Sequence, residues 1–187
     1  YYRRNRRQGV VNYGEIIKPG QIPKKNKMDI TITYYIDKSG SMHGEPIKNA
    51  FNASHLFSKS LFNNTHNESI INDFKFTYYA FNTKFYKMKE NQIPQADGSN
   101  VDFNEILEYI HEHSLNDMIN IIITDAQFPI NNRKCIQAIK ETSGLFIVVA
   151  NNNSNETEFT EIETALKGKF KFLLADEKFS FNSSQIK

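Results

Sequence analysis

The sequence predicts an α/β fold with a doubly wound, mainly parallel six-stranded sheet that carries helices on both faces. Two observations support this prediction. Short apolar or β-branched segments alternate with amphipathic stretches along most of the chain, and the length of 187 residues is that of one ordinary domain. Because parallel strands need crossover connections, such an alternation covers both faces of the sheet with helices.

Five segments have the length and composition of buried strands. Each has six to nine residues and is rich in Ile, Val, Phe, Tyr or Thr, which favour strands. Their ranges are 28–36, 73–81, 118–124, 145–150 and 170–175. A short sixth segment, 85–88, follows the second one through Asn82-Thr83-Lys84 and is expected to pair with it as a hairpin.

Four stretches between these strands have apolar residues at helical spacing. The first carries a stripe formed by Ile47, Ala50, Phe51, Ser54, Phe57 and Leu61. The second carries a similar stripe formed by Phe103, Ile106, Leu107 and Ile110. Before it, Asp102 followed by Glu105 has the spacing of a capping box. Residues 132–142 and 156–167 complete the set, and the resulting order of elements predicts a Rossmann-like sheet.

The charge of the chain is unevenly distributed. Residues 1–27 contain eight Lys and Arg against Glu15, a net charge of +7, whereas the remaining residues carry −5. The sequence therefore predicts a basic extended arm or connector over 1–27, a domain over 28–176 and a C-terminal tail over 177–187. The arm could neutralise nucleic-acid phosphates, but docking on an acidic neighbouring subunit, or on the upstream part of a longer chain, is favoured because no nucleic-acid-binding fold is evident.

Several function classes are excluded or disfavoured by composition. No run approaches the roughly 18 apolar residues that a membrane span needs. Cys135 is the single cysteine, so the chain has no internal disulfide and no zinc site built from cysteines, and we expect an intracellular, cytoplasmic setting. His111-Glu112-His113 lacks the i, i+4 spacing of a zinc-binding helix and is interpreted as a solvated helix end.

Polar residues follow two of the predicted strands directly. Asp37-Lys38-Ser39-Gly40-Ser41 comes after 28–36, and Asp125 comes after 118–124. In a doubly wound sheet with the strand order 3-2-1-4-5-6, these two strands flank the point where the order reverses, and sites form beyond their carboxyl ends. We therefore expect Asp37 and Asp125 to face each other across one crevice.

Two carboxylates held close together repel each other unless a cation lies between them. The hydroxyls of Ser39 and Ser41 add hard oxygen ligands on a tight loop, which favours Mg²⁺, with Mn²⁺ and Ca²⁺ as alternatives. This set leaves coordination positions for water or for an outside ligand, such as an Asp or Glu side chain of a partner protein. An aspartyl-phosphate enzyme is disfavoured, because Ser39 stands where such enzymes usually have a second Asp.

These residues carry a family resemblance. Asp37-x-Ser39-x-Ser41 followed by Met42 resembles the DxSGSM signature of von Willebrand factor A (VWA) domains, and Ile123-Thr124-Asp125-Ala126 resembles their later TDG-like element. The resemblance covers residues 28–175 in element order. It implies a metal-ion-dependent adhesion site (MIDAS) in which Ser39 and Ser41 bind the metal directly, while Asp37 and Asp125 act largely through bound water and hydrogen bonds.

The sequence departs from the family pattern in two places. The third motif usually supplies a Thr in a GGT-like loop, whereas this chain has Gly98-Ser99-Asn100-Val101. Two alignments with the GGT-like loop are possible. The favoured one makes Asn100 the oxygen ligand, with Ser99 as the next choice. The other places Val101 at the position of the Thr, and a valine side chain cannot bind a metal. The second departure is Ala126, which replaces the customary Gly.

Taken together, the sequence predicts a divalent-metal-dependent protein-binding module rather than an enzyme. A carboxylate of the partner would complete the coordination of the metal. Residues 37–42 form the predicted metal loop, and Gly44-Glu45-Pro46 after it resembles intracellular VWA modules, which commonly work with AAA+ ATPases. The alternative is a structural or assembly element, for example in a phage virion or an AAA+ complex, whose metal site is weakened.

Overall fold

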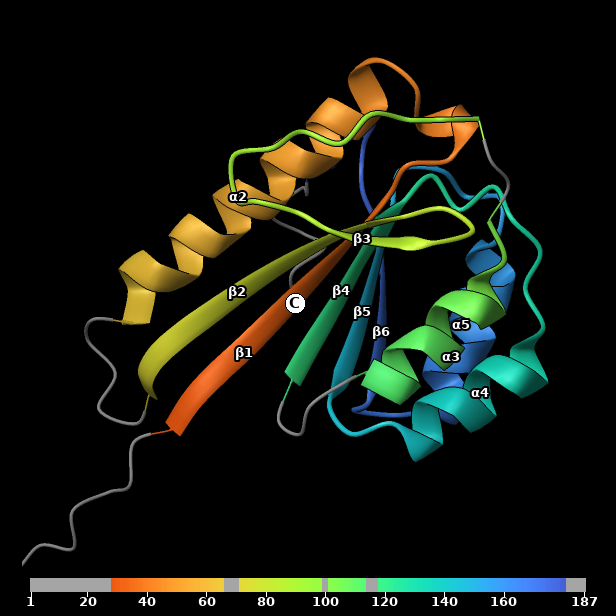
Figure 1. Cartoon of the computed structure of the whole chain (residues 1–187). Helices are drawn as coiled ribbons and strands as arrows, with labels where there is room; N and C mark the ends of the chain where they lie inside the picture. Colours follow the sequence, from red (N-terminus) through yellow and green to blue (C-terminus); the bar gives the residue numbers. More distant parts are fainter. Residues whose placement is uncertain (1–27, 66–70, 99–100, 114–117, 181–187) are drawn as a thin grey trace, which may run out of the picture.

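A computed structural model describes residues 28–65, 71–98, 101–113 and 118–180 as a single six-stranded sheet with helices on both faces (Figure 1). The predicted arm over 1–27 and the end of the predicted tail, residues 181–187, lie outside the described residues. The strands are β1 (Met28–Asp37), β2 (Ile71–Phe81), β3 (Phe85–Lys87), β4 (Met118–Thr124), β5 (Leu145–Ala150) and β6 (Phe170–Leu174). Their order in the sheet is β3-β2-β1-β4-β5-β6, which confirms the predicted topology.

All strand pairs are parallel except the pair of β2 and β3. The antiparallel pair is the predicted hairpin, and Phe81 lies opposite Phe85 across its turn. The sheet is therefore doubly wound and mainly parallel, as the alternation of strands and helices predicted.

In the described ranges, four α-helices and one short 3-10 turn connect the strands. They are η1 (Gly40–Met42), α2 (Glu45–Thr65), α3 (Phe103–His113), α4 (Asn132–Glu141) and α5 (Glu156–Ala165). Helix α2 lies on one face of the sheet, and α3, α4 and α5 lie together on the other (Figure 1). Each predicted helical stretch corresponds to one of these α-helices.

The alternation of side chains along the strands creates two separate cores. Tyr35, Ile122 and Val148 point to the face covered by α3, α4 and α5. Tyr34 and Ile121, their neighbours in sequence, point to the face covered by α2. The parallel strands are therefore apolar on both faces over most of their length.

The start of α3 differs in detail from the predicted capping box. The Asp102 carboxylate accepts a hydrogen bond from the backbone N–H of Asn104 at 2.8 Å, instead of from that of Glu105. The helix is nevertheless capped at the predicted residue, because an acceptor at this position satisfies one of its free N–H groups.

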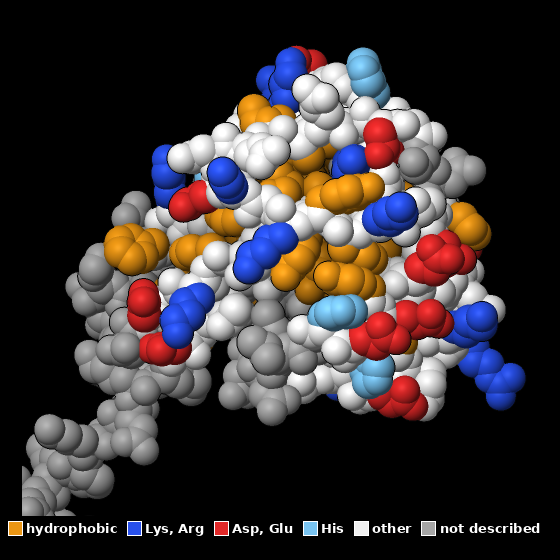
Figure 2. Space-filling model, viewed as in Figure 1, with side chains coloured by type: hydrophobic (Ala, Val, Ile, Leu, Met, Phe, Trp, Pro, Cys, Tyr) orange, Lys and Arg blue, Asp and Glu red, His pale blue; other side chains and the backbone are white. Residues whose placement is uncertain are grey.

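The surface of the described residues has a clear charge distribution. Acidic side chains gather over α3, where Glu105, Glu108 and Glu112 are exposed, and apolar side chains gather around β3 (Figure 2). His111 and His113 lie at the end of α3 and are exposed, as predicted. No described helix is both long enough and apolar enough to cross a membrane.

Candidate metal centre

The carboxyl ends of β1 and β4 bring the two predicted aspartates together. The strands pair in parallel with Ile36 opposite Ile123, so that the residues following each strand emerge at the same edge of the sheet. Asp37 is fully buried, and Asp125 is 5% exposed. The juxtaposition that the topology predicted is therefore present, with both acidic side chains in the interior.

Asp37 is held by two hydrogen bonds. Its Oδ1 accepts from the backbone N–H of Ser39 at 2.8 Å, and its Oδ2 accepts from the hydroxyl of Thr124 at 2.6 Å. Burial nevertheless raises the pKa of Asp37 to about 6, because these two hydrogen bonds lower it less than desolvation raises it, and the charge of Asp125 raises it further. Keeping Asp37 charged in this buried position therefore costs free energy, and a nearby cation would lower that cost.

The metal loop has one serine hydroxyl in the interior and one at the surface. Ser39 is buried and Ser41 is exposed, and their Oγ atoms lie 3.1 Å apart. Met42, which ends the η1 turn, is fully buried in the core under α2. Its burial anchors the loop, so that Ser41 stays at the rim of the crevice.

Asp125 supplies the observation most specific to a cation. Its Oδ1 accepts from the backbone N–H of Gln127 at 3.2 Å, but its Oδ2 is buried with no hydrogen-bond partner among the described residues. A buried carboxylate oxygen without a partner is expensive, and such oxygens are normally paired or bound to a metal. Together with the Asp37 carboxylate and two serine hydroxyls, this oxygen gives an all-oxygen set that suits a hard cation.

The segment after β4 is fixed by hydrogen bonds of Thr124 and Asn155, for which the sequence predicted no individual role. Thr124 Oγ1 accepts a hydrogen bond from the backbone N–H of Ala126 at 3.0 Å while its hydroxyl donates to Asp37. The amide of Asn155, just before α5, donates to the carbonyls of Ala126 and Phe128 at 2.6 and 2.7 Å. The position of Asp125 is thereby determined from both sides.

Ala126 has a left-handed backbone conformation, with a φ of 58°. This conformation costs an L-residue roughly 1 kcal/mol or more and favours glycine. The customary Gly of the family at this position therefore has a physical reason, and the replacement by Ala places modest strain beside the site.

The segment that precedes α3 lies against the metal loop. The backbone N–H of Asp97 donates to the carbonyl of Lys38 at 3.1 Å, and the Asp97 carboxylate pairs with Lys38 Nζ at 2.9 Å and accepts from the amide of Asn82. Gly98 follows and packs directly on Gly40, where a Cβ atom would lie 2.9 Å from the Gly98 Cα. This contact places Gly98, the start of the third motif, directly against the metal loop.

The two candidate ligands of the third motif, Ser99 and Asn100, lie outside the described residues. Their neighbours are placed: Gly98 contacts the metal loop, and Val101 is buried in the core under α3. The choice of Asn100 or Ser99 as an additional oxygen ligand stays a prediction.

Replacing Gly40 with Ala is expected to destabilise the protein by about 1–3 kcal/mol and to weaken Mg²⁺ binding, because the new methyl group would push the backbone of Gly98 away. Urea unfolding and calorimetry measure the two effects. Gly168→Ala is the matched control: it introduces backbone strain at a φ of 79° but meets no neighbouring atom. Equal Mg²⁺ affinity of wild type and Gly40→Ala would show that this contact does not shape the site.

Within the described residues, no three His, Cys, Asp or Glu side chains gather in a way that could hold a metal ion. The candidate centre has two such residues, Asp37 and Asp125, and its other oxygens come from serine. Its ligand set therefore depends on hydroxyls, and on water, more than on charged side chains.

The chain has few detectable similarities to known proteins. No family model matches the chain, and no curated protein matches its sequence. Among solved structures, the chain is similar to the crystal structure of the ArnB paralog VWA2 from Sulfolobus acidocaldarius, with 15% sequence identity and a TM-score of 0.47. The match covers 79% of this chain and 42% of the Sulfolobus protein. A likeness of this degree carries no argument about the site, which rests on the contacts described above.

Proposed function

We propose that this chain is a VWA-type protein-binding module that holds Mg²⁺ at Asp37, Ser39, Ser41 and Asp125, where a carboxylate of a partner protein completes the coordination. The single observation that carries the proposal is Oδ2 of Asp125, which is buried next to a second buried carboxylate and has no hydrogen-bond partner in the part of the chain that the structure describes. A cation at this position would satisfy that oxygen and relieve the repulsion between the two aspartates.

The spacing of the hydroxyls supports a small octahedral ion. Mg²⁺ binds oxygen at 2.0–2.1 Å, so two neighbouring ligands of an octahedron lie about 3.0 Å apart. The Oγ atoms of Ser39 and Ser41 are 3.1 Å apart. The two hydroxyls now contact each other, and at this distance both could bind one Mg²⁺ or Mn²⁺ ion as neighbouring ligands.

The buried and the exposed residues of the site would have different roles in metal binding. Ser39 and Ser41 would bind the ion directly, with the exposed Ser41 on the side that a partner approaches. Asp37 and Asp125 would supply negative charge and accept hydrogen bonds from bound water, and Ser99 or Asn100 would add a further oxygen. The bound ion would act as a fixed positive charge that attracts an Asp or Glu side chain.

Binding suits the site better than catalysis. The hydroxyls of Ser39 and Ser41 lie 3.1 Å apart and contact each other, and the carboxylate beside Ser39 is that of Asp37. Both oxygens of Asp37 already accept hydrogen bonds from the protein. We therefore propose a partner protein, such as an AAA+ ATPase or a component of a larger assembly, as the ligand.

Calorimetry with Mg²⁺ and Mn²⁺ tests the proposal. Wild-type protein is expected to bind one ion, Asp37→Ala is expected to lose at least about 100-fold in affinity, and Glu108→Gln on the distant helix α3 is expected to bind like the wild type. Absence of binding by the wild type, or equal binding by Asp37→Ala, would refute the metal site.

The strained Ala126 favours one alternative function, an assembly element whose metal site has weakened. In that case a co-purifying partner would stay bound in EDTA and would tolerate the Ser39→Ala/Ser41→Ala double variant. Release of the partner by EDTA would instead support the metal-dependent module.

A further inference from the structure

A cleft opens beside the metal loop, between β3 and the segment 92–95 that follows it. Tyr86 on β3 and Ile93 on the segment are among the residues that line it. Its volume of about 550 Å³ lies in the range of ligand sites. Lys38 of the metal loop also lines the cleft, so that the cleft and the candidate metal centre adjoin each other.

Two contacts hold Lys38 between the metal loop and the cleft. Its Nζ lies 2.9 Å from a carboxylate oxygen of Asp97 and 4.3 Å from the centre of the Tyr86 ring. The ion pair and the cation–π contact fix this side chain, which is only 15% exposed. Lys38 therefore links the Tyr86 ring directly to the loop that carries Ser39 and Ser41.

The cleft carries positive charge. Among the described residues that line it, Lys38 and Lys87 are charged, and none is Asp or Glu. The charge of Lys38 is balanced by Asp97, whereas Lys87 is exposed and forms no ion pair within the ranges that the structure describes. A carboxylate placed at Lys87 would therefore complement the charge of the cleft.

The cleft also presents apolar surface. Tyr86 is 42% exposed and Ile93 is 48% exposed. Covering such surface gains about 25 cal/mol per Å² of apolar area, and exposed aromatic side chains are frequent anchors of protein interfaces. The two side chains thus offer a contact for an apolar residue of a ligand, next to the cation of Lys87.

We propose that the cleft binds an acidic, extended segment of the partner protein, in which one carboxylate pairs with Lys87 and an apolar side chain packs on Tyr86 and Ile93. The inference rests on the proposed function, because the same partner places another carboxylate on the metal. Side chains of an extended segment alternate between two sides, so that alternating acidic and apolar residues make both kinds of contact. The cleft thereby selects the partner through the residues that flank its metal-binding carboxylate.

Nucleic acid fits this surface less well. Phosphate backbones bind through several free Lys and Arg side chains, whereas Lys87 alone is unpaired among the described charged residues of the cleft. The exposed Glu105, Glu108 and Glu112 gather over α3 (Figure 2), where they would repel a long polyanion. A short peptide with few charges avoids that repulsion.

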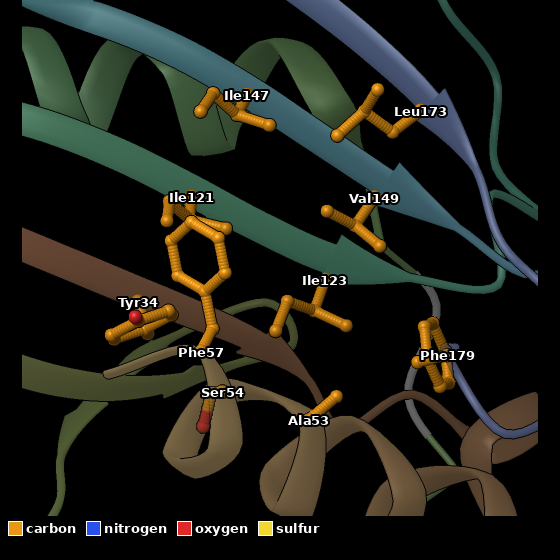
Figure 3. Close-up of a pocket in the computed structure, with 10 residues that line it drawn as sticks. All are labelled: Tyr34, Ala53, Ser54, Phe57, Ile121, Ile123, Ile147, Val149, Leu173 and Phe179. Atoms are coloured by element: carbon orange, nitrogen blue, oxygen red, sulfur yellow. The ribbon is translucent and has the colours of Figure 1, made fainter. Parts of the chain in front are cut away.

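The apolar groove between α2 and strands β4 to β6 provides a comparison within the same molecule (Figure 3). Its described lining contains Phe57, which is 42% exposed, and no Lys, Arg, Asp or Glu. The groove therefore offers apolar area without charge. Phe57→Ala is the matched control for Ile93→Ala, because both variants remove an exposed apolar side chain.

Fluorescence anisotropy with two labelled peptides of about ten residues, long enough to span the cleft in extended form, tests the proposal. One peptide alternates Glu with Leu, and the other alternates Lys with Leu. In EDTA, the wild type is expected to bind the Glu–Leu peptide at least about tenfold more tightly than the Lys–Leu peptide. Lys87→Glu is expected to reverse this preference. Lys134→Glu, an exposed site on α4 on the other face of the sheet, is expected to bind like the wild type.

The apolar contact has its own expected result. Ile93→Ala is expected to weaken binding of the Glu–Leu peptide about fivefold, and Phe57→Ala is expected to leave it unchanged. Equal losses in these two variants would show that the peptide binds apolar surface in general. That result, absence of peptide binding, an unchanged preference of Lys87→Glu, or tighter binding of a labelled oligothymidylate of the same length would overturn the proposal.

Repeating the titration with Mg²⁺ separates the cleft from the metal site. Mg²⁺ is expected to raise the affinity for the Glu–Leu peptide, and Asp125→Asn is expected to lose this gain. An effect of Lys87→Glu without any effect of Mg²⁺ would refute the metal site but not the cleft. An effect of Mg²⁺ without any effect of Lys87→Glu would refute the cleft but not the metal site.

Discussion

Replacing Asp125 with Asn is expected to abolish Mg²⁺ binding and to leave the metal-free protein at least as stable as the wild type near neutral pH. The reason is that Asp125 Oδ2 is buried without a partner among the residues that the structure describes, and that Asp125 lies beside the buried Asp37. Removing one of the two charges lowers the repulsion and the desolvation cost, which offsets the cost of burying an amide without a full set of partners. We expect a change in the free energy of unfolding between zero and about +2 kcal/mol in EDTA.

Urea unfolding with and without Mg²⁺ measures both parts of this expectation. Saturating Mg²⁺ should stabilise the wild type and have no effect on Asp125→Asn, because only a state that binds the ion gains from it. Asp73→Asn on β2 is the matched control, since that carboxylate is exposed and far along the strand from the site. A metal-free Asp125→Asn protein that is several kcal/mol less stable than the wild type would mean that the Asp125 charge is satisfied without a cation.

The fold could be predicted because its signals are local and repeated. Apolar strands of the right length, separated by stripes such as Phe103 to Ile110, leave few arrangements other than a doubly wound sheet. Even the short β3 was predictable, since three polar residues between two β-rich segments favour a hairpin. The positions of Asp37 and Asp125 then followed from the strand order alone.

The supporting parts of the site could not be predicted in the same way. Thr124 belongs to the TDG-like element, but the sequence does not show that its hydroxyl donates to Asp37 rather than simply lying at the end of an apolar strand. The contacts of Lys38 with Asp97, and of Gly40 with Gly98, join segments that are nearly 60 residues apart. The connection between β3 and α3 has no periodicity, so its register against the metal loop depends on these tertiary contacts.

Replacing Thr124 with Val is expected to destabilise the protein by about 3 kcal/mol and to weaken Mg²⁺ binding by roughly 10- to 100-fold. The change keeps the shape of the side chain but removes the donor to Asp37 and the acceptor for the backbone N–H of Ala126. Asp37 would then be buried with one hydrogen bond fewer, which raises its pKa further and disfavours the charged form that the metal needs.

Thr33→Val on β1 separates this effect from the general loss of a buried hydroxyl. The Thr33 hydroxyl is equally buried but has no hydrogen-bond partner among the described residues. Its removal is therefore expected to be neutral or to stabilise the protein by up to about 1 kcal/mol, with Mg²⁺ affinity unchanged. If the two Thr→Val variants lost the same stability and the same affinity, Thr124 would be an ordinary core residue. A loss confined to Thr124→Val would identify Thr124 as a residue that positions Asp37, because its hydroxyl, unlike that of Thr33, links the ends of β1 and β4.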